Sequence, residues 1–283
     1  MQDPQTRHSG SGKRRDIIGD VIESLTAAQR EANAGANGGV PTAEFAGRVP
    51  YDTYVHATTL HSLQRTLSGD PGEMSFLMVS QIMELYFGLT RFELDGARTL
   101  IRDGDAWGAL APLRRATLDL EGLNAAWKAL SWMTPADFNT FRDLLGEGSG
   151  FQSAAYRELE FLLGLKTESL IRPFRRSESY PRLVKALEEP SLWDETQRML
   201  EEHDTDWVEV YRVDGPDNHL RMLGEALTGV SVAFGEWRHQ HLMAVRRTMG
   251  AKPGSGGSAG IAWLEKSMAR VVFPELWEAR TYM

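Results

Sequence analysis

The chain contains no cysteine among its 283 residues. It therefore forms no disulfide, no thiolate zinc site and no thiolate bond to a cofactor metal. It also lacks an uninterrupted apolar run of about 18 residues, the length that a membrane-spanning helix needs. We expect a cytoplasmic protein that does not cross a membrane.

Positive charge is in shorter supply than negative charge. The chain has 31 Lys and Arg residues against 39 Asp and Glu residues, which gives a net charge of −8. A protein that binds nucleic acid usually has a basic face, so we expect no nucleic-acid partner. Apolar residues make up 42% of the chain, enough for a sizeable core. The length fits one large domain or two small ones, and we favour one.

The alternation of apolar and polar residues that marks a β-strand is missing throughout. Helical spacing is common instead, and it predicts an all-α fold. Residues 1–14 are polar, basic and rich in Gly and Ser; they lack the apolar core of a signal peptide and are predicted to be a disordered tail. Residues 15–283 are then a single helical domain. Its predicted helices cover about 16–31, 52–67, 73–101, 107–130, a segment after Thr134, 153–165, 182–202, 215–250 and a last segment after 260.

Arg142 is the first candidate functional residue. Thr134 and Pro135 predict a helix start, with the Thr as its cap. On the predicted helix, Phe138 and Leu145 share a face with Arg142. A guanidinium among aromatic rings needs an anion, and its planar fork matches a carboxylate. A ligand carboxylate and an internal ion pair with an acidic residue are both open.

His241 is the second candidate. His239 lies about 200° away around the predicted helix, so the two histidines cannot easily bind one metal, and His239 should face solvent. A core histidine with a hydrogen-bond partner is the plainer interpretation of His241 alone. An axial ligand of haem iron is the functional one, because neutral imidazole in an apolar pocket suits that role. By helical spacing, the face of His241 also carries Trp237, Ala244, Val245 and Thr248.

The glycine-rich stretch 254–258 (Gly-Ser-Gly-Gly-Ser) allows three interpretations. As a phosphate-binding loop it is weak, because it follows a helix and lacks the Lys-Ser/Thr ending. A segment that closes over a ligand and a plain linker both fit.

Several segments together resemble the tryptophan 2,3-dioxygenase family, in order and in spacing, from Tyr51 to Thr281. They are 51–54 (Tyr-Asp-Thr-Tyr), Phe76 with 81–85 (Gln-Ile-Met-Glu-Leu), 138–142 (Phe-Asn-Thr-Phe-Arg), 149–153 (Ser-Gly-Phe-Gln-Ser) with Arg157 and Glu160, Trp237-Arg238-x-x-His241 with Arg247, Gly250 and 254–257, and 273–277 (Phe-Pro-Glu-Leu-Trp) with Arg280 and Thr281.

The resemblance implies a helical bundle that binds haem b and assembles as a homotetramer. It implies that His241 is the proximal iron ligand, with Ser149 and Trp237 beside the cofactor. It also implies a set of substrate-binding residues. They are Arg142 for the carboxylate, Phe138 and Phe76 for the indole, Tyr51 and Tyr54 from a neighbouring subunit, and Ser255 for the ammonium group, where the family has a threonine.

The chain departs from the family at the distal histidine, which is replaced by Ser80. A hydroxyl can hydrogen-bond to oxygen or to the indole N–H, but it is a poor base near neutral pH. The related indoleamine dioxygenases resemble this site in having a distal serine. We therefore assign Ser80 as the candidate catalytic residue on the oxygen-binding side.

These features predict an oxygenase that uses ferrous haem and O2 on tryptophan or a β-substituted tryptophan such as β-methyltryptophan. Ring cleavage to an N-formylkynurenine is the first expectation. Monooxygenation to a 2-oxindole in secondary metabolism, with an external reductant, is the alternative. Two further alternatives remain. One is an enzyme that hydroxylates a phenol, and the other is a non-catalytic helical protein that binds haem or has a structural role.

Overall fold

A computed structural model describes residues 24–41, 45, 47, 49–212, 215, 218–254 and 256–283. The tail predicted for residues 1–14 lies outside this part of the chain. The chain divides into two compact units, Met1–Arg65 and Thr66–Met283, which we describe separately. The single domain expected over residues 15–283 stays a prediction.

The first unit contains short helices. They are α1 (Ala27–Ala36), α2 (Pro50–Val55) and α3 (Ala57–His61). Helix α1 begins at a capping box, in which the side chains of Thr26 and Gln29 each bond to the other's backbone N–H. One continuous helix over 52–67 was expected, but His56 adopts a left-handed backbone with φ 55° and separates α2 from α3.

The second unit contains the long helices and the core. Its α-helices are α4 (Pro71–Arg102), α5 (Ala106–Ala126), α6 (Pro135–Asn139), α7 (Ala154–Leu162), α8 (Tyr180–Glu188), α9 (Leu192–Glu202), α10 (Trp207–Arg212), α11 (His219–Met249), α12 (Ile261–Met268) and α13 (Pro274–Ala279). Its 3₁₀ helices are η1 (Trp127–Leu130), η2 (Arg142–Leu145), η3 (Gly150–Gln152), η4 (Glu168–Phe174) and η5 (Arg280–Tyr282). The described residues include no strand, which confirms the all-α prediction.

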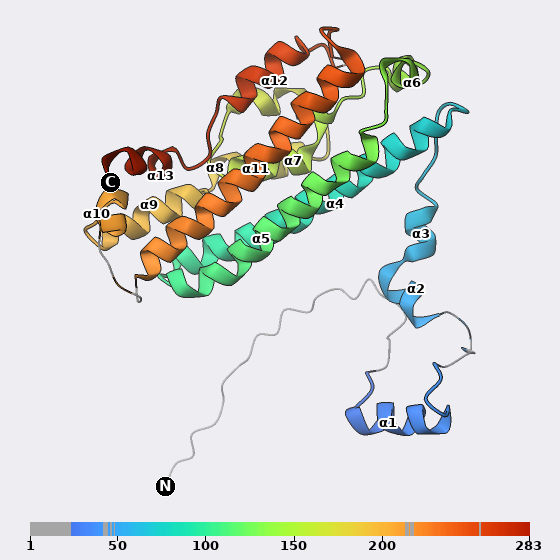
Figure 1. Cartoon of the computed structure of the whole chain (residues 1–283), viewed down its shortest axis with the longest axis horizontal. Coiled ribbons are helices and arrows are strands. Elements are labelled where there is room, and N and C mark those ends of the chain that lie inside the picture. The colour runs from blue at the N-terminus through green and yellow to red at the C-terminus, as the bar shows by residue number, and fades with distance from the viewer. Residues whose placement is uncertain are drawn as a thin grey trace, which may run out of the picture. The chain divides into compact units, whose positions relative to one another are not determined.

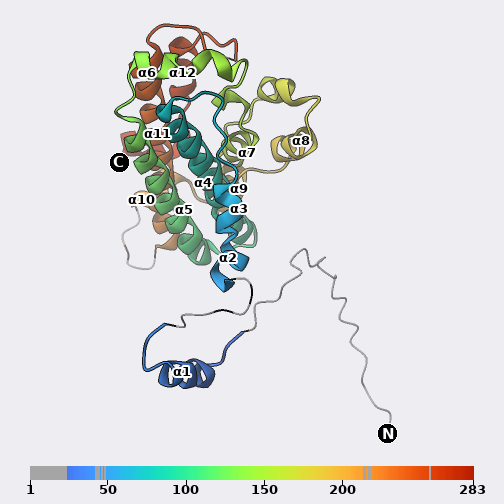
Figure 2. The same cartoon turned by 90° about the vertical axis from the view of Figure 1, so that its right-hand side faces the viewer.

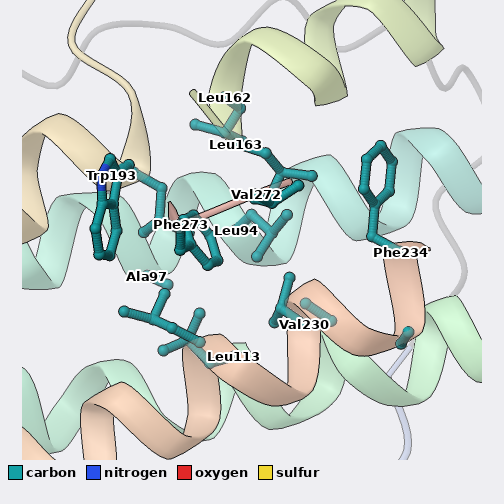
Figure 3. Packing of buried hydrophobic residues seen from close by; sticks show 14 of the residues in the cluster. Leu94, Ala97, Leu113, Leu162, Leu163, Trp193, Val230, Phe234, Val272 and Phe273 are labelled. Atoms are coloured by element: carbon teal, nitrogen blue, oxygen red, sulfur yellow. The ribbon is translucent and has the colours of Figure 1, made fainter. Parts of the chain in front are cut away.

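Three helices, α4, α5 and α11, run side by side along this unit (Figures 1 and 2). Helix α4 has 32 residues and α11 has 31, so each is roughly 45–50 Å long. Helices α7 and α9 pack against α4, and α12 packs against α11. Figure 3 shows apolar side chains from several of these helices meeting in one cluster, among them Leu94, Ala97, Leu113, Trp193, Val230, Phe234 and Phe273.

Local signals set the ends of these helices. Asp70 caps α4 through its carboxylate, which accepts from the Gly72 N–H at 2.7 Å, and Pro71 occupies the first turn. Asn218 caps α11 in the same way. The observed bounds agree closely with the predicted helices 73–101, 107–130 and 215–250.

Two predicted helices of the second unit also differ from the structure. The segment 182–202 is split into α8 and α9, because Pro190 disfavours a helical conformation at Glu189. The helix after Thr134 starts as predicted, with Thr134 and Asp137 in a capping box, but it already ends at Asn139. There the Thr140 hydroxyl bonds back to the Asp137 carbonyl, which competes with helix continuation.

In the described part of the chain, no helix combines the length and the apolarity that crossing a membrane requires.

The buried face of α5 gives a stability test. Leu120 is fully buried in the core, whereas Leu118, on the same helix, is 55% exposed. We expect Leu120→Ala to lower the free energy of unfolding by about 2–5 kcal/mol, because it removes packed methyl groups and leaves a cavity. Leu118→Ala should change it by no more than about 0.5 kcal/mol. Urea unfolding followed by circular dichroism measures both, and equal losses would contradict this core.

Candidate active site

The second unit contains a cavity of about 430 Å³, within the size range of ligand pockets. Side chains from α4, α6, α11, α12, η1, η2 and η3 and from the loops beside them form its wall. Most of them are apolar or aromatic. The lining residues include Phe76, Trp127, Phe138, Ser149, Phe151, His241, Ala244, Val245, Arg247, Thr248, Gly254 and Trp263.

His241 lies in the cavity wall, on the second half of α11. Its ring stacks on Trp127, with centroids 5.4 Å apart and planes 14° apart, and it also contacts Trp237 at 5.4 Å. Ala244, Val245 and Thr248 line the same cavity, as their helical spacing predicts. His239 points away and is exposed. Among the described residues, the His241 ring has no hydrogen-bond partner, so the interpretation as a satisfied core histidine loses its support.

His241 is held in its neutral form. Burial lowers the pKa of its imidazole to about 4, and the positive charge of Arg157 adds to this effect. The ring still exposes part of its surface to the cavity. A neutral imidazole with an unused nitrogen lone pair is the form that binds a metal.

An aromatic cluster forms another part of the wall. The ring centroids of Phe76 and Phe138 are 5.7 Å apart, and both contact Phe141, at 5.5 and 5.4 Å. Phe76 and Phe138 line the cavity, while Phe141 is fully buried behind them. This pair offers an apolar surface of the kind that a flat aromatic ring packs against.

Arg142 does not share a helix with Phe138, which corrects the expectation of a common helical face. Helix α6 ends before it, and Arg142 opens η2. It is half-buried and outside the cavity lining, and its Nη2 donates to the Pro253 carbonyl at 2.7 Å. No ion pair joins it to an acidic residue in the described chain. Pro253 precedes Gly254, which does line the cavity, so Arg142 lies beside the loop at the cavity edge.

Ser149 lines the cavity, as expected for a residue beside the cofactor. Its hydroxyl accepts from the Phe151 N–H at 3.4 Å and caps η3. The glycine-rich loop comes very close to it, since a Cβ on Gly256 would lie 2.9 Å from the Ser149 Cβ. Only a glycine permits this approach. Ser255, the expected ammonium ligand, lies outside the described residues.

Ser80 and Trp237 do not line the cavity. The Ser80 hydroxyl donates to the Phe76 carbonyl one turn back at 2.8 Å. Trp237 is buried behind His241 and borders a smaller space of about 40 Å³ that also contacts the histidine. Trp237 therefore supports the His241 ring from behind.

Tyr51 and Tyr54 belong to the first unit, on α2. Their side chains are 68% and 77% exposed. Exposed aromatic residues of this size are available to a partner surface.

Sequence reasoning missed two parts of the site. Trp127, which stacks on His241, comes from the end of α5, and no motif marked it. Arg157 was noted only as a match to the family. It is almost fully buried, is paired with Glu160 and lies 5.0 Å from Phe151 and 5.9 Å from Trp263, two rings of the wall. The contacts of Trp127 with His241 and of Arg157 with Trp263 join residues more than a hundred positions apart in the sequence.

These residues fit a haem. The described residues contain no cluster of three or more His, Asp or Glu side chains that would hold a bare metal ion. One neutral histidine in an apolar cavity suits a metal whose other ligands come from a porphyrin. Fold and site thus define the class: an all-helical protein with an apolar cavity that has one neutral histidine in its wall, an arrangement suited to haem.

Comparison with known proteins identifies the family. A family model of tryptophan 2,3-dioxygenase matches residues 34–206 and 205–283, and the chain belongs to this family. It is 35% identical over 264 residues to the tryptophan 2,3-dioxygenase of Ralstonia pickettii, covering 84% of this chain and 94% of that protein. It is also 35% identical over 277 residues to that of Burkholderia orbicola, covering 89% and 88%. Proteins of this family depend on haem, and haem b is therefore the cofactor of this chain.

The neutral state of His241 predicts a pH effect on the haem-free chain. Above about pH 6.5 the imidazole is neutral in both the folded and the unfolded state. Between about pH 6.5 and 4 the unfolded chain takes up a proton that the folded one does not, so stability falls as the pH falls. Because part of the ring faces the cavity, we expect a loss of about 1–2 kcal/mol by about pH 5.

Urea unfolding near pH 7 and near pH 5 measures this loss. His241→Gln, which is neutral at every pH, should remove it, and His239→Gln on the exposed side should keep it. An identical pH dependence in wild type and His241→Gln would refute the assignment.

Proposed function

We propose that this chain is a haem-dependent oxygenase that acts on the indole ring of tryptophan or of a β-substituted tryptophan, with O2 as co-substrate. The single observation that carries the proposal is the neutral His241 in the wall of an apolar cavity, without a hydrogen-bond partner in the described chain. Membership of the tryptophan 2,3-dioxygenase family supports the substrate class.

His241 is the protein ligand of the haem iron in this proposal. Trp127 stacked on one side and Trp237 packed nearby fix the orientation of its ring. Ferrous haem b supplies the binding and activation of O2. The contribution of the protein is to position the substrate and to keep water out of an apolar cavity.

The substrate is held at both of its ends. Phe76 and Phe138 present an apolar wall for the indole. Arg142 binds the carboxylate with its guanidinium, which has to exchange its bond to the Pro253 carbonyl for the substrate. Ser255 binds the ammonium group. The glycine-rich stretch 254–258 then closes over the ligand, and the close approach of Gly256 to Ser149 fits such a role.

Ser80 determines which hydrogen bonds the side of the haem that binds O2 can offer. In the structure its hydroxyl donates to the Phe76 carbonyl, and it must rotate to reach a ligand. Neither arrangement makes it a base near neutral pH. Proton abstraction from the indole N–H by this residue is therefore no part of the proposed mechanism; Ser80 acts as a hydrogen-bond donor or acceptor.

Ring cleavage is the first proposed outcome. Both atoms of O2 enter the substrate, the C2–C3 bond of the indole breaks, and an N-formylkynurenine results. Monooxygenation is the second candidate, and the replacement of histidine by Ser80 is the observation that favours it. One oxygen atom then gives a 2-oxindole, and the other leaves as water with two electrons and two protons from an external reductant.

The remaining proposals concern assembly and setting. We propose a cytoplasmic homotetramer, in which Tyr51 and Tyr54 of one subunit reach the cavity of the next. Their exposure supports this role. A substituted substrate such as β-methyltryptophan would place the enzyme in secondary metabolism. A non-catalytic haem protein is the rival from another class.

Product mass separates these functions. Haem-loaded ferrous protein is mixed with labelled O2 and equal amounts of L-tryptophan and β-methyl-L-tryptophan, with and without ascorbate. We expect a product with two labelled oxygen atoms and no need for ascorbate. One labelled atom and a need for ascorbate would establish monooxygenation. The absence of any product from a protein with a normal Soret band would favour the non-catalytic reading.

The iron ligand has its own test. His241→Ala should lose the Soret band of bound haem, because no second histidine lines the cavity in the described part of the chain. His239→Ala is the matched control on the exposed side and should keep it. A normal haem spectrum in His241→Ala would sink the assignment.

A further inference from the structure

We propose that Arg247 binds a propionate carboxylate of the haem and so anchors the edge of the porphyrin. This inference rests on the haem site of the proposed function. It concerns a residue that the proposed mechanism does not use.

Arg247 is the one charged side chain in the cavity lining, within the part of the chain that the structure describes. The other polar lining groups there are neutral side chains and backbone. A haem carries two carboxylates, and an anion in an apolar cavity is costly unless a cation pairs with it. The cavity therefore offers one strong partner for such a carboxylate.

The guanidinium of Arg247 is also largely unused. Its Nε donates to the Met133 carbonyl at 3.3 Å, which fixes the side chain against the segment before α6. Its two Nη groups bond to no described residue. Nearby arginines differ: Arg246 pairs with Glu265, and Arg238 donates to the Arg270 carbonyl at 2.7 Å and to the Ser267 hydroxyl at 3.1 Å. Arg247 thus lines the cavity with an exposed side chain whose two Nη groups have no described partner, and such a fork matches a carboxylate.

The position of Arg247 suits the edge of a porphyrin. It lies on the same helix as His241 and six residues further on, which corresponds to about 9 Å along the helix axis. The iron binds at the centre of the ring, whereas the propionates extend from its rim. A cation displaced along the helix from the iron ligand is thus placed for the rim. Arg142, outside the lining, remains available for the carboxylate of the substrate.

The test compares hemin with iron protoporphyrin IX dimethyl ester, in which both carboxylates are masked. Full-length haem-free protein is titrated with each porphyrin and followed by the Soret band. Arg247→Met should weaken hemin binding roughly 10- to 100-fold, the range expected when a hydrogen bond to a charged group is lost. Its affinity for the ester should equal that of the wild type. Arg247→Lys keeps the charge but lacks the planar fork, so its hemin affinity should lie between those of the wild type and Arg247→Met.

Arg246→Met is the matched control. It removes the same charge from the same turn of α11, so it shares any loss of helix-dipole stabilisation, but Arg246 does not line the cavity. It should bind both porphyrins like the wild type. Thermal unfolding of the haem-free variants confirms that each one folds.

Three results would overturn the proposal, each in a recognisable way. If Arg247→Met lowers the affinity for hemin and for the dimethyl ester equally, Arg247 contributes to the cavity wall but does not bind a propionate. If hemin affinity is unchanged in Arg247→Met but the KM for tryptophan rises, Arg247 binds the carboxylate of the substrate and not that of the haem. A wild-type protein that binds neither porphyrin would remove the proposed function itself, and the inference with it.

Discussion

The packing of α5 against α11 is the constraint on which the rest of the site depends. Near the C-terminal end of α5, the buried Asn124 side chain donates to the Ala233 carbonyl at 3.0 Å. This bond fixes how far one helix is shifted along the other, since an unpaired N–H in the core is costly; the Asn124 Oδ1 has no partner among the described residues. One turn further along, the same register brings Trp127 over the ring of His241. The direction in which the histidine presents its nitrogen to the cavity thus follows from helix packing.

The apolar cavity determines which of its few polar groups can carry a charge and where they lie. Charges interact strongly where the surroundings have a low dielectric constant, and uncompensated ones are excluded. The histidine is accordingly neutral, and the buried Arg157 is balanced by Glu160. Cations that remain without an acidic partner, such as Arg142 and Arg247, lie at the edge. Such a site suits a substrate and a cofactor that are flat and apolar in the middle and carry carboxylates at the rim.

Local patterns in the sequence were enough for much of the fold. The periodicity of α4 and α11 and the capping signal at Thr134 predicted those elements, because each depends on residues within a few turns. The same reasoning placed His241 and His239 on opposite sides of their helix. The end of α6 before Arg142 was not predicted, since the competition between the Thr140 hydroxyl and helix continuation is decided by small differences. The stacking of Trp127 on His241 and the bond of Arg142 to Pro253 join residues more than a hundred positions apart, and one sequence carries no local sign of them.

Helix α11 serves two purposes along its length. Its first half, with Leu223, Leu227 and Val230, is buried in the core, whereas its last turns line the cavity. The two halves therefore draw their stability from different sources. The core holds the first half whether or not a ligand is present, but the last turns gain protection only in proportion to ligand concentration, by mass action. In hydrogen exchange, the amides of one continuous helix would report two different opening energies, and cofactor loading would raise only the second.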